Sequence, residues 1–404
     1  MRWSVKVLAA AAALCVGTSL AQAQYSDGII KLGVMNDQSG LYSDLSGQGS
    51  VWSAKKAIED FCKTTKCHDK IEVVFADHQN KPDVGSNIVR QWFDVDKVDA
   101  VVDVPTSSVA LAVNNITKEK NKVFLVSGAA SSDLTGKACT PNTVHWTYDT
   151  WALANGTGNA IVKTGGDTWF FLTADYAFGH ALERDTAAVV EKSGGKVVGK
   201  VRHPFPGQDF SSFLLQAQQS KAKIIGLANA GADTTNAIKQ ASEFGIVAGG
   251  QNLAGLLVFI TDVHALGLKT AQGLIMTEAW YWDGNDNNRA FAKEFAPANK
   301  GNMPTMVQAG VYSAVMHYLK AVHELKSDAD GAAVVAKMKS MPTDDKLFGK
   351  GTIRQDGRKI HDMYLFEVKK PSESKAPWDY YKVRATIPAA EAFRPIDQGE
   401  CPLK

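Results

Sequence analysis

Short apolar runs with the length of buried strands alternate with segments of helical periodicity along most of the chain. The run from Ile29 to Met35 is followed by Val51, Ala54 and Ile58, which share one face of a helix. Parallel strands need crossover connections, usually helices, so this alternation predicts parallel sheets covered by helices. With 404 residues, 45% of them hydrophobic, the chain is long enough for two such domains.

The alternation occurs twice, and Thr140-Pro141-Asn142 separates the two units. The strands that we expect lie at residues 29–35, 71–77, 99–104 and 122–126 in the first unit, and at residues 168–173, 195–203, 222–229 and 255–261 in the second. The fold class predicted from this order is α/β, with two parallel-sheet units in tandem.

The last third of the chain has a different pattern. A long helix is expected from Met306 to Leu325 and a shorter one over residues 332–341. The runs "GTIR" and "MYLFEV" flank Asp356-Gly357, a hairpin turn signal, so we expect them to pair. The tail, residues 370–404, is rich in proline and charged residues, and we expect it to lie along the surface.

The first 23 residues have the features of a secretory signal peptide. Arg2 and Lys6 precede an apolar run, residues 7–16, and Ala21-Gln22-Ala23 fits a cleavage site. A transmembrane anchor, the alternative, needs about 20 apolar residues, and this run is shorter. We expect residues 1–23 to be removed and the mature protein to be periplasmic. Its net charge is then about zero, which gives no support to nucleic-acid or polybasic membrane binding.

Four cysteines remain after removal of the signal peptide: Cys62, Cys67, Cys139 and Cys401. An even number in an exported protein favours disulfides, and three pairings are possible. Local closure of Cys62 with Cys67 leaves Cys139 with Cys401. Zinc is the alternative, but a C-x4-C spacing with distant partners is a poor match to zinc ligands, so we expect no metal site.

Small and hydroxyl residues follow three strands of the first unit, in the runs "NDQSGLYSD", "PTSSVA" and "SGAASSD". Ligands of open α/β sheets bind beyond these strand ends, where backbone N–H groups and helix N-termini favour anions. In the second unit Asp233 either caps its helix or faces a ligand ammonium. Two to four aromatic residues near these ends are expected to touch the ligand, from the set Trp146, Tyr148, Trp151, Tyr176, Phe178, Trp280, Tyr281 and Trp282.

The sequence offers no catalytic constellation. No G-x-S-x-G, P-loop, H-E-x-x-H or G-x-G-x-x-G motif occurs, and the nine histidines are scattered without ligand spacing. His145 and His180 are interpreted as structural or cleft-edge residues, because neither has an evident nucleophile or carboxylate partner in the sequence. We therefore expect a protein that is not an enzyme and has no cofactor.

In the order and spacing of its motifs, the chain resembles the type I periplasmic solute-binding proteins of the leucine/isoleucine/valine-binding class, which serve ATP-driven importers. The runs that carry the resemblance are "IKLGVMNDQSG", "VPTSSVALAV", "VFLVSGAASSDLTG", "TADYAFG", "GLANAGADTTNAIKQA" and "PTMVQAGVYSAV". The resemblance implies two doubly wound lobes joined by a three-segment hinge. The implied division is residues 26–146 plus about 274–350 for the first lobe, residues 147–273 plus about 351–369 for the second, and residues 370–404 for the tail.

The resemblance also implies site residues and partners. Carried over by position, the carboxylate-binding elements fall on Ser107, Ala129 and Ser131, the ammonium partner on Asp233, and the aromatic residue of the second lobe on Phe178 or Tyr176. The implied partners are a small-molecule solute and the membrane permease and ATPase subunits of an importer, with the binding protein itself a monomer.

The stretch "EAWYWDG", which contains Trp280, departs from the leucine-binding pattern, as does the loop after the first strand. These regions shape the side-chain pocket of the family. The ligand is therefore either an amino acid, with the branched-chain type favoured, or an aromatic carboxylate. A sensory ligand-binding module is a further alternative that predicts the same pocket.

Overall fold

In the first lobe, the apolar runs of the first unit form a five-stranded parallel sheet in the order β2-β1-β3-β4-β5. The computed structural model describes residues 25–65, 67 and 70–403, so the expected signal peptide, residues 1–23, lies outside the described residues. The strands are β1 (Ile29–Asn36), β2 (Lys70–Asp77), β3 (Ala100–Asp103), β4 (Val123–Val126) and β5 (Thr143–His145). Every residue of β3, β4 and β5 is buried, as expected for a parallel sheet covered on both faces.

Helices from two separate parts of the chain cover this sheet. They are α1 (Gly47–Thr65), α2 (Pro82–Asp94) and α3 (Ser107–Glu119), and, from the last third, α11 (Asp286–Ala298), α12 (Met306–Leu325) and α13 (Gly331–Ser340). Helix α12 packs along α1, and nearly all of its residues from Met306 to Val322 are buried. Thr305 and Gln308 begin α12 with a capping box.

The second lobe contains a four-stranded parallel sheet in the order β7-β6-β8-β9. Its strands are β6 (Thr168–Ala174), β7 (Lys196–His203), β8 (Ile224–Ala228) and β9 (Asn252–Gly255). Its helices are α4 (Thr150–Leu153), α5 (Asn159–Lys163), α6 (Ala177–Lys192), α7 (Ser211–Gln219), α8 (Ala232–Glu243), α9 (Ile260–Leu266) and α10 (Leu268–Ala271), with a π-helical turn (Ala154–Gly158) between α4 and α5.

The prediction of a strand at residues 255–261 is wrong. The strand β9 ends at Gly255, and the apolar residues after it form a buried loop that leads into α9. A continuous apolar run signals burial but not conformation. Asp262 ends the extended stretch, because its side chain accepts the N–H of Phe259, the N-cap residue of α9.

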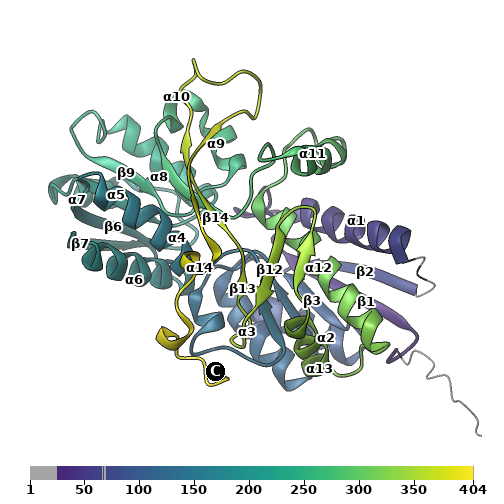
Figure 1. Ribbon diagram of the computed structural model, residues 1–404. Helices are drawn as coiled ribbons and strands as arrows, with labels where there is room; N and C mark the ends of the chain where they lie inside the picture. The colour runs from purple at the N-terminus through teal and green to yellow at the C-terminus, as the bar shows by residue number, and fades with distance from the viewer. Residues whose placement is uncertain (1–24, 66, 68–69, 404) are drawn as a thin grey trace, which may run out of the picture.

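An antiparallel sheet of β10 (Ile275–Glu278), β14 (Met363–Val368) and β15 (Tyr381–Ile387) lies between the two lobes (Figure 1). A small sheet of β11 (Thr343–Asp345), β12 (Gly349–Ile353) and β13 (Lys359–Ile360) lies beside α12 and α13. The chain leaves the first lobe after β5 and returns to it after β10. It joins β10 again only at β14, after β12, which contains Gly351, has paired with β11 and β13. The crossing expected near Gly351 stays a prediction.

Two expectations for the end of the chain need correction. The turn at Asp356-Gly357 is present, but β12 pairs across it with β13, while "MYLFEV" is β14 and pairs with β10 and β15. The tail does not only lie along the surface: residues 381–387 form β15, and Trp378, Phe393 and Cys401 are buried. Composition misses these contacts because they are made with segments far away in the sequence.

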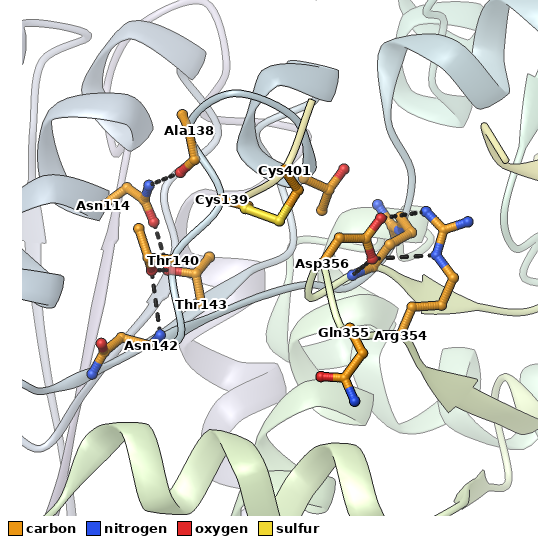
Figure 2. The surroundings of a disulfide bond; sticks show 12 residues. Asn114, Ala138, Cys139, Thr140, Asn142, Thr143, Arg354, Gln355, Asp356 and Cys401 are labelled. Carbon is orange, nitrogen blue, oxygen red and sulfur yellow. Dashed lines mark hydrogen bonds and ion pairs between the residues drawn. A yellow bond between two sulfur atoms is a disulfide. The ribbon is translucent and has the colours of Figure 1, made fainter. Parts of the chain in front are cut away.

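Both disulfides join the pairs expected from the sequence: the local pair and the two cysteines that it leaves. Cys62 is bonded to Cys67 within the first lobe, with their Cα atoms 4.8 Å apart. Cys139 is bonded to Cys401, 262 positions away in the sequence, with their Cα atoms 5.6 Å apart. Figure 2 shows the surroundings of this second disulfide, which include the ion pair between Arg354 and Asp356. The tail is thereby fastened to the first lobe after β15 has paired within the central sheet.

Candidate ligand site

A small cavity lies between the two lobes, at the carboxyl ends of their parallel strands. Its lining residues are Tyr42, Leu45, Pro105, Gly128, Ala130, Tyr148, Tyr176, Phe178, Ala230, Leu257 and Phe259. The room inside is about 10 Å³, enough for roughly one water molecule, so the walls must move apart to admit a solute. Among the described lining residues none is lysine, arginine or histidine.

The two lobes touch at the edge of this cavity. The hydroxyl groups of Tyr42 in the first lobe and Tyr176 in the second lie 2.6 Å apart. The ring of Phe205 stacks on Tyr176, with centroids 4.0 Å apart, and lies 5.9 Å from the ring of Tyr42. Gly231 has a φ of 58°, and a Cβ there would lie 2.6 Å from the carbonyl oxygen of Leu41. Only glycine permits this close approach, and the lobes are therefore in a closed arrangement.

The expected carboxylate-binding residues lie behind the wall of the first lobe. Ser107 opens α3, and its Oγ accepts the N–H of Ser131 at 3.2 Å. Oγ of Ser131 accepts the N–H of Asp133 at 3.4 Å. The carbonyl of Ala129 is bonded to Nε2 of His145 at 2.7 Å. None of the three expected residues lines the cavity, but the neighbours of Ala129, Gly128 and Ala130, do.

Asp233 lies in the first turn of α8, two residues after its N-cap, Gly231, and has no capping contact with that helix. Its Oδ1 accepts the N–H of Gly207 at 3.0 Å, while its Oδ2 has no partner and the residue is only 2% exposed. Burial raises the pKa of Asp233 to about 7, against the lowering effect of the Gly207 N–H. The charge of this carboxyl group also helps to raise the pKa of Tyr42 and Tyr176, which line the cavity, so Asp233 lies close to the cavity.

The aromatic candidates separate into two groups. Tyr148, Tyr176 and Phe178 line the cavity. Trp280 does not: it is 2% exposed and packs edge-on against Phe291, with centroids 6.2 Å apart. The structure therefore favours a core role for Trp280, because its spacing in the sequence could not distinguish a pocket wall from the core.

Several residues of the site are absent from the sequence-based set. Tyr42 lies in the quoted run "NDQSGLYSD" but was not singled out, and Phe259 lies in the run expected to be a strand. Asp103 ends β3 with a φ of 82°, followed by Val104 with a φ of 53°. Positive φ values at two consecutive non-glycine residues cost energy, and such strain concentrates at functional sites. No local sequence pattern signals it.

Neither His145 nor His180, the two histidines singled out in the sequence, lines the cavity. His145 is fully buried against the Ala129 carbonyl, and burial together with the nearby Arg358 guanidinium lowers its pKa well below the usual value. His180 pairs with Asp175 at the protein surface, at 2.7 Å. Within the described residues, no group of three or more His, Cys, Asp or Glu side chains is placed to hold a metal ion, and no helix is long and apolar enough to cross a membrane.

Comparison with known proteins identifies the family. A family model described as "Periplasmic binding protein" matches residues 29–375. A solved periplasmic binding protein from Burkholderia mallei is 53% identical, with a TM-score of 0.90 over 93% of this chain and 99% of that one. A branched chain amino acid ABC transporter periplasmic ligand-binding protein from Burkholderia xenovorans LB400 is 40% identical, with a TM-score of 0.81 over 93% and 99% of the two chains.

Among curated relatives, Leu/Ile/Val-binding protein homolog 6 from Brucella melitensis is 25% identical over 375 residues, which cover 89% of this chain and 93% of that protein. Both solved relatives and this chain thus share a fold over nearly their full lengths. The chain belongs to the periplasmic binding protein family and is a solute-binding protein of the kind that serves ABC transporters.

Proposed function

We propose that this protein captures a small carboxylate-bearing solute between its lobes, an amino acid with an apolar side chain first of all, and presents it to the permease and ATPase subunits of an importer. The observation that carries the proposal is the unpartnered, buried Oδ2 of Asp233 beside a small apolar cavity. A buried carboxylate without a partner is costly unless a ligand supplies one, and an ammonium group does so.

The other end of the amino acid has donors in the first lobe. The backbone at Gly128 and Ala130 lines the cavity, and Ser107 opens α3 behind it. Backbone N–H groups and a helix N-terminus favour a carboxylate. The apolar side chain then lies against the rings of Tyr148, Phe178 and Phe259, which come from the first crossing and the second lobe.

Capture follows from the placement of these residues on both lobes. A solute in the cavity touches the walls of both lobes only when the lobes are closed, so it shifts the equilibrium toward the closed form, in which Tyr42 and Tyr176 meet. The closed form is the signal that a loaded binding protein gives to its membrane partners.

An aromatic carboxylate is the second candidate. Five of the cavity residues are tyrosine or phenylalanine, and their ring faces and edges suit a single aromatic ring. Such a solute has no ammonium group and leaves Asp233 without its partner. The two candidates therefore differ in how far binding depends on Asp233.

Calorimetry with leucine, phenylalanine and 4-hydroxybenzoate tests the proposal on the wild type, Asp233→Asn and Ser131→Ala. For an amino acid, Asp233→Asn should weaken binding by about 30- to 1,000-fold, as for one partner of a buried charge pair. For 4-hydroxybenzoate the same change should do far less. Asp167→Asn, an exposed acid of the second lobe paired with Lys223, is the control and should leave every affinity unchanged.

Two outcomes would contradict the proposal. If Ser131→Ala leaves every affinity unchanged, the carboxylate does not bind beside this residue. If none of these solutes or their close analogues binds, the class of solute is wrong.

A further inference from the structure

A wide, open groove of about 1080 Å³ lies at the base of the second lobe. By the base we mean the end of the lobe at the amino ends of its parallel strands, opposite the cavity at their carboxyl ends. The walls of the groove come from the turns before β6, β8 and β9, from the end of α8 and from α10. Solute capture between the lobes does not use this groove.

Exposed lysines gather around the base. They lie at the ends of α5 and α6, at the starts of β7 and β8, and in α10. We call them the base lysines: Lys163, Lys192, Lys196, Lys221, Lys223 and Lys269. Lys223 and Lys269 line the groove itself. The exposed acids at the base are fewer, namely Asp167, Glu191 and Glu243, so positive charge is in excess there, although the mature chain has a net charge of about zero.

The corresponding end of the first lobe differs in how its lysines are paired. Nζ of Lys120 and Nζ of Lys122, on either side of the turn before β4, lie 2.7 Å and 2.9 Å from aspartate carboxylates. Of the six base lysines, only Lys223 forms an ion pair with a described residue, Asp167, at 3.0 Å. The positive charge at the base of the second lobe is therefore available to an anionic partner.

Apolar side chains lie beside the base lysines. Phe244 and Val247, in the turn that follows α8, are each 50% exposed, while Ile246 between them is buried and holds the turn to the lobe. Val247 lines the groove together with Lys223 and Lys269. A lipid bilayer accepts both kinds of group, because anionic headgroups attract lysines and the acyl boundary takes up apolar side chains. A soluble anion uses only the lysines.

We infer that the base of the second lobe is a membrane-contact surface: the base lysines bind the phosphates of anionic lipid headgroups, and Phe244 and Val247 enter the boundary between headgroups and acyl chains. The attraction of lysines to an anionic bilayer is electrostatic and is screened by salt. Because the base is the end of the lobe opposite the cavity, the cavity stays open to solution while the protein is held at the surface. The inference does not depend on which solute the cavity takes.

Sedimentation of the mature protein with lipid vesicles tests the inference. One vesicle type contains phosphatidylglycerol and phosphatidylethanolamine, and the other contains phosphatidylcholine alone. The wild type should bind the anionic vesicles at least tenfold more tightly than the neutral ones at about 50 mM salt. Most of this preference should be lost at about 500 mM salt, because the Debye length is then only a few ångströms.

Lys221→Gln combined with Lys269→Gln removes two base lysines. Each lysine near an anionic bilayer contributes about fivefold in affinity, so the double variant should bind the anionic vesicles about 25-fold more weakly. Lys70→Gln combined with Lys97→Gln, in the first lobe, makes the same change of net charge and should bind like the wild type. All four lysines are exposed, and urea denaturation should give similar stabilities for the wild type and both variants.

Dextran sulfate, a soluble polyanion, separates a bilayer from other anionic partners. Phe244→Ser should weaken binding to the anionic vesicles by at least threefold and leave binding of dextran sulfate unchanged, because only a bilayer takes up the ring. If Phe244→Ser binds the vesicles like the wild type, the surface recognises a soluble anion and the membrane contact is overturned. Equal binding of both vesicle types by the wild type, or equal losses in the two double variants, overturns the inference as well.

Discussion

Two buried regions of this protein hold charged side chains in opposite ways. The hinge cluster consists of Arg358 and Lys359, which are fully buried next to the first crossing between the lobes. Arg358 donates to the carbonyl of Tyr148 at 2.9 Å, lies 3.6 Å from Asp149 and has its guanidinium 4.6 Å from the ring centre of Phe393. All these partners are fixed parts of the protein.

Lys359 is held in the same region by aromatic rings. Its Nζ lies 4.8 Å from the ring centre of Trp146 and 4.3 Å from that of Phe348. Burial lowers the pKa of Lys359 to about 7, and the nearby Asp345 opposes that effect. Cation–π contacts with two rings stabilise the charged form where a hydrogen-bond partner is missing among the described residues.

The carboxyl group of Asp233, buried beside the cavity, has no such internal compensation. Its Oδ2 has no partner among the described residues, and burial raises its pKa to about 7. Fixed groups of the protein compensate the buried charges of the hinge cluster, whereas we propose that a ligand compensates Asp233. The following predictions test this difference, from the largest expected effect to the smallest.

Removing the long-range disulfide should have the largest effect on stability, because it fastens the tail, including Phe393, against the hinge cluster. In the chain-entropy treatment, loss of the Cys139–Cys401 bond in a Cys139→Ser, Cys401→Ser variant costs about 5 kcal/mol. The matched control, Cys62→Ser with Cys67→Ser, opens a short loop and should cost about 2 kcal/mol. Urea denaturation measures both. Equal losses would show that the tail does not support the hinge.

Replacing Arg358 with methionine tests the hinge cluster directly. The change leaves Asp149 and the Tyr148 carbonyl without their buried cation, and should lower the free energy of unfolding by about 3–5 kcal/mol. Arg384→Met, which removes an exposed ion pair with Glu367, should cost less than about 1 kcal/mol. A loss of similar size in both variants would refute the structural role of the hinge charges.

The opposite sign is expected for Asp233, the buried acid beside the cavity. Because the pKa of folded Asp233 is about 7, the folded protein takes up a proton as the pH falls through 7, while the unfolded chain does so only near 4. Asp233 should therefore contribute stability to the ligand-free protein as the pH falls from 8 to 5, while buried histidines such as His145 and His361, whose pKa values burial lowers, act in the opposite direction. Asp233→Asn should remove this contribution and stabilise the protein relative to the wild type at pH 8 by roughly 1–3 kcal/mol. Urea denaturation at pH 8, 6.5 and 5 measures the slope.

The Asp167→Asn control should keep the wild-type slope of stability against pH. If Asp233→Asn is less stable than the wild type at pH 8, the fold requires the Asp233 carboxylate, as it requires Arg358, and the prediction is wrong.

The smallest effect is expected from the hydroxyl pair that joins the lobes. Tyr42→Phe removes one of two hydroxyls that lie 2.6 Å apart, a contact worth about 0.5–1.5 kcal/mol. Solute dissociation from the closed form should become about 2- to 10-fold faster, as measured by stopped-flow fluorescence. Tyr364→Phe, on β14, should leave the rate unchanged. An unchanged rate in Tyr42→Phe would show that the pair does not stabilise closure.

Much of the architecture could be predicted from local patterns in the sequence. The strands β1, β2, β6 and β8 and the helix α12 lie where apolar runs and helical periodicity indicated, since both patterns act over a few neighbouring residues. The family was also accessible, because its motifs occur in order along nearly the whole mature chain. The hairpin at Asp356-Gly357 was predicted at the correct turn but with the wrong partner strand.

The sequence by itself determined the order of strands and helices and the two α/β units, because each depends on residues close together in the chain. The family resemblance added Tyr176 or Phe178 as the aromatic site residue, and both line the cavity. Only the tertiary structure decided that Trp280 packs in the core, that β14 and β15 share a sheet with β10, and that the tail reaches the hinge. The same is true of the surroundings of Asp233. Gly207, 26 positions away, donates its N–H to this buried carboxyl group, and that contact depends on long-range packing that no local pattern encodes.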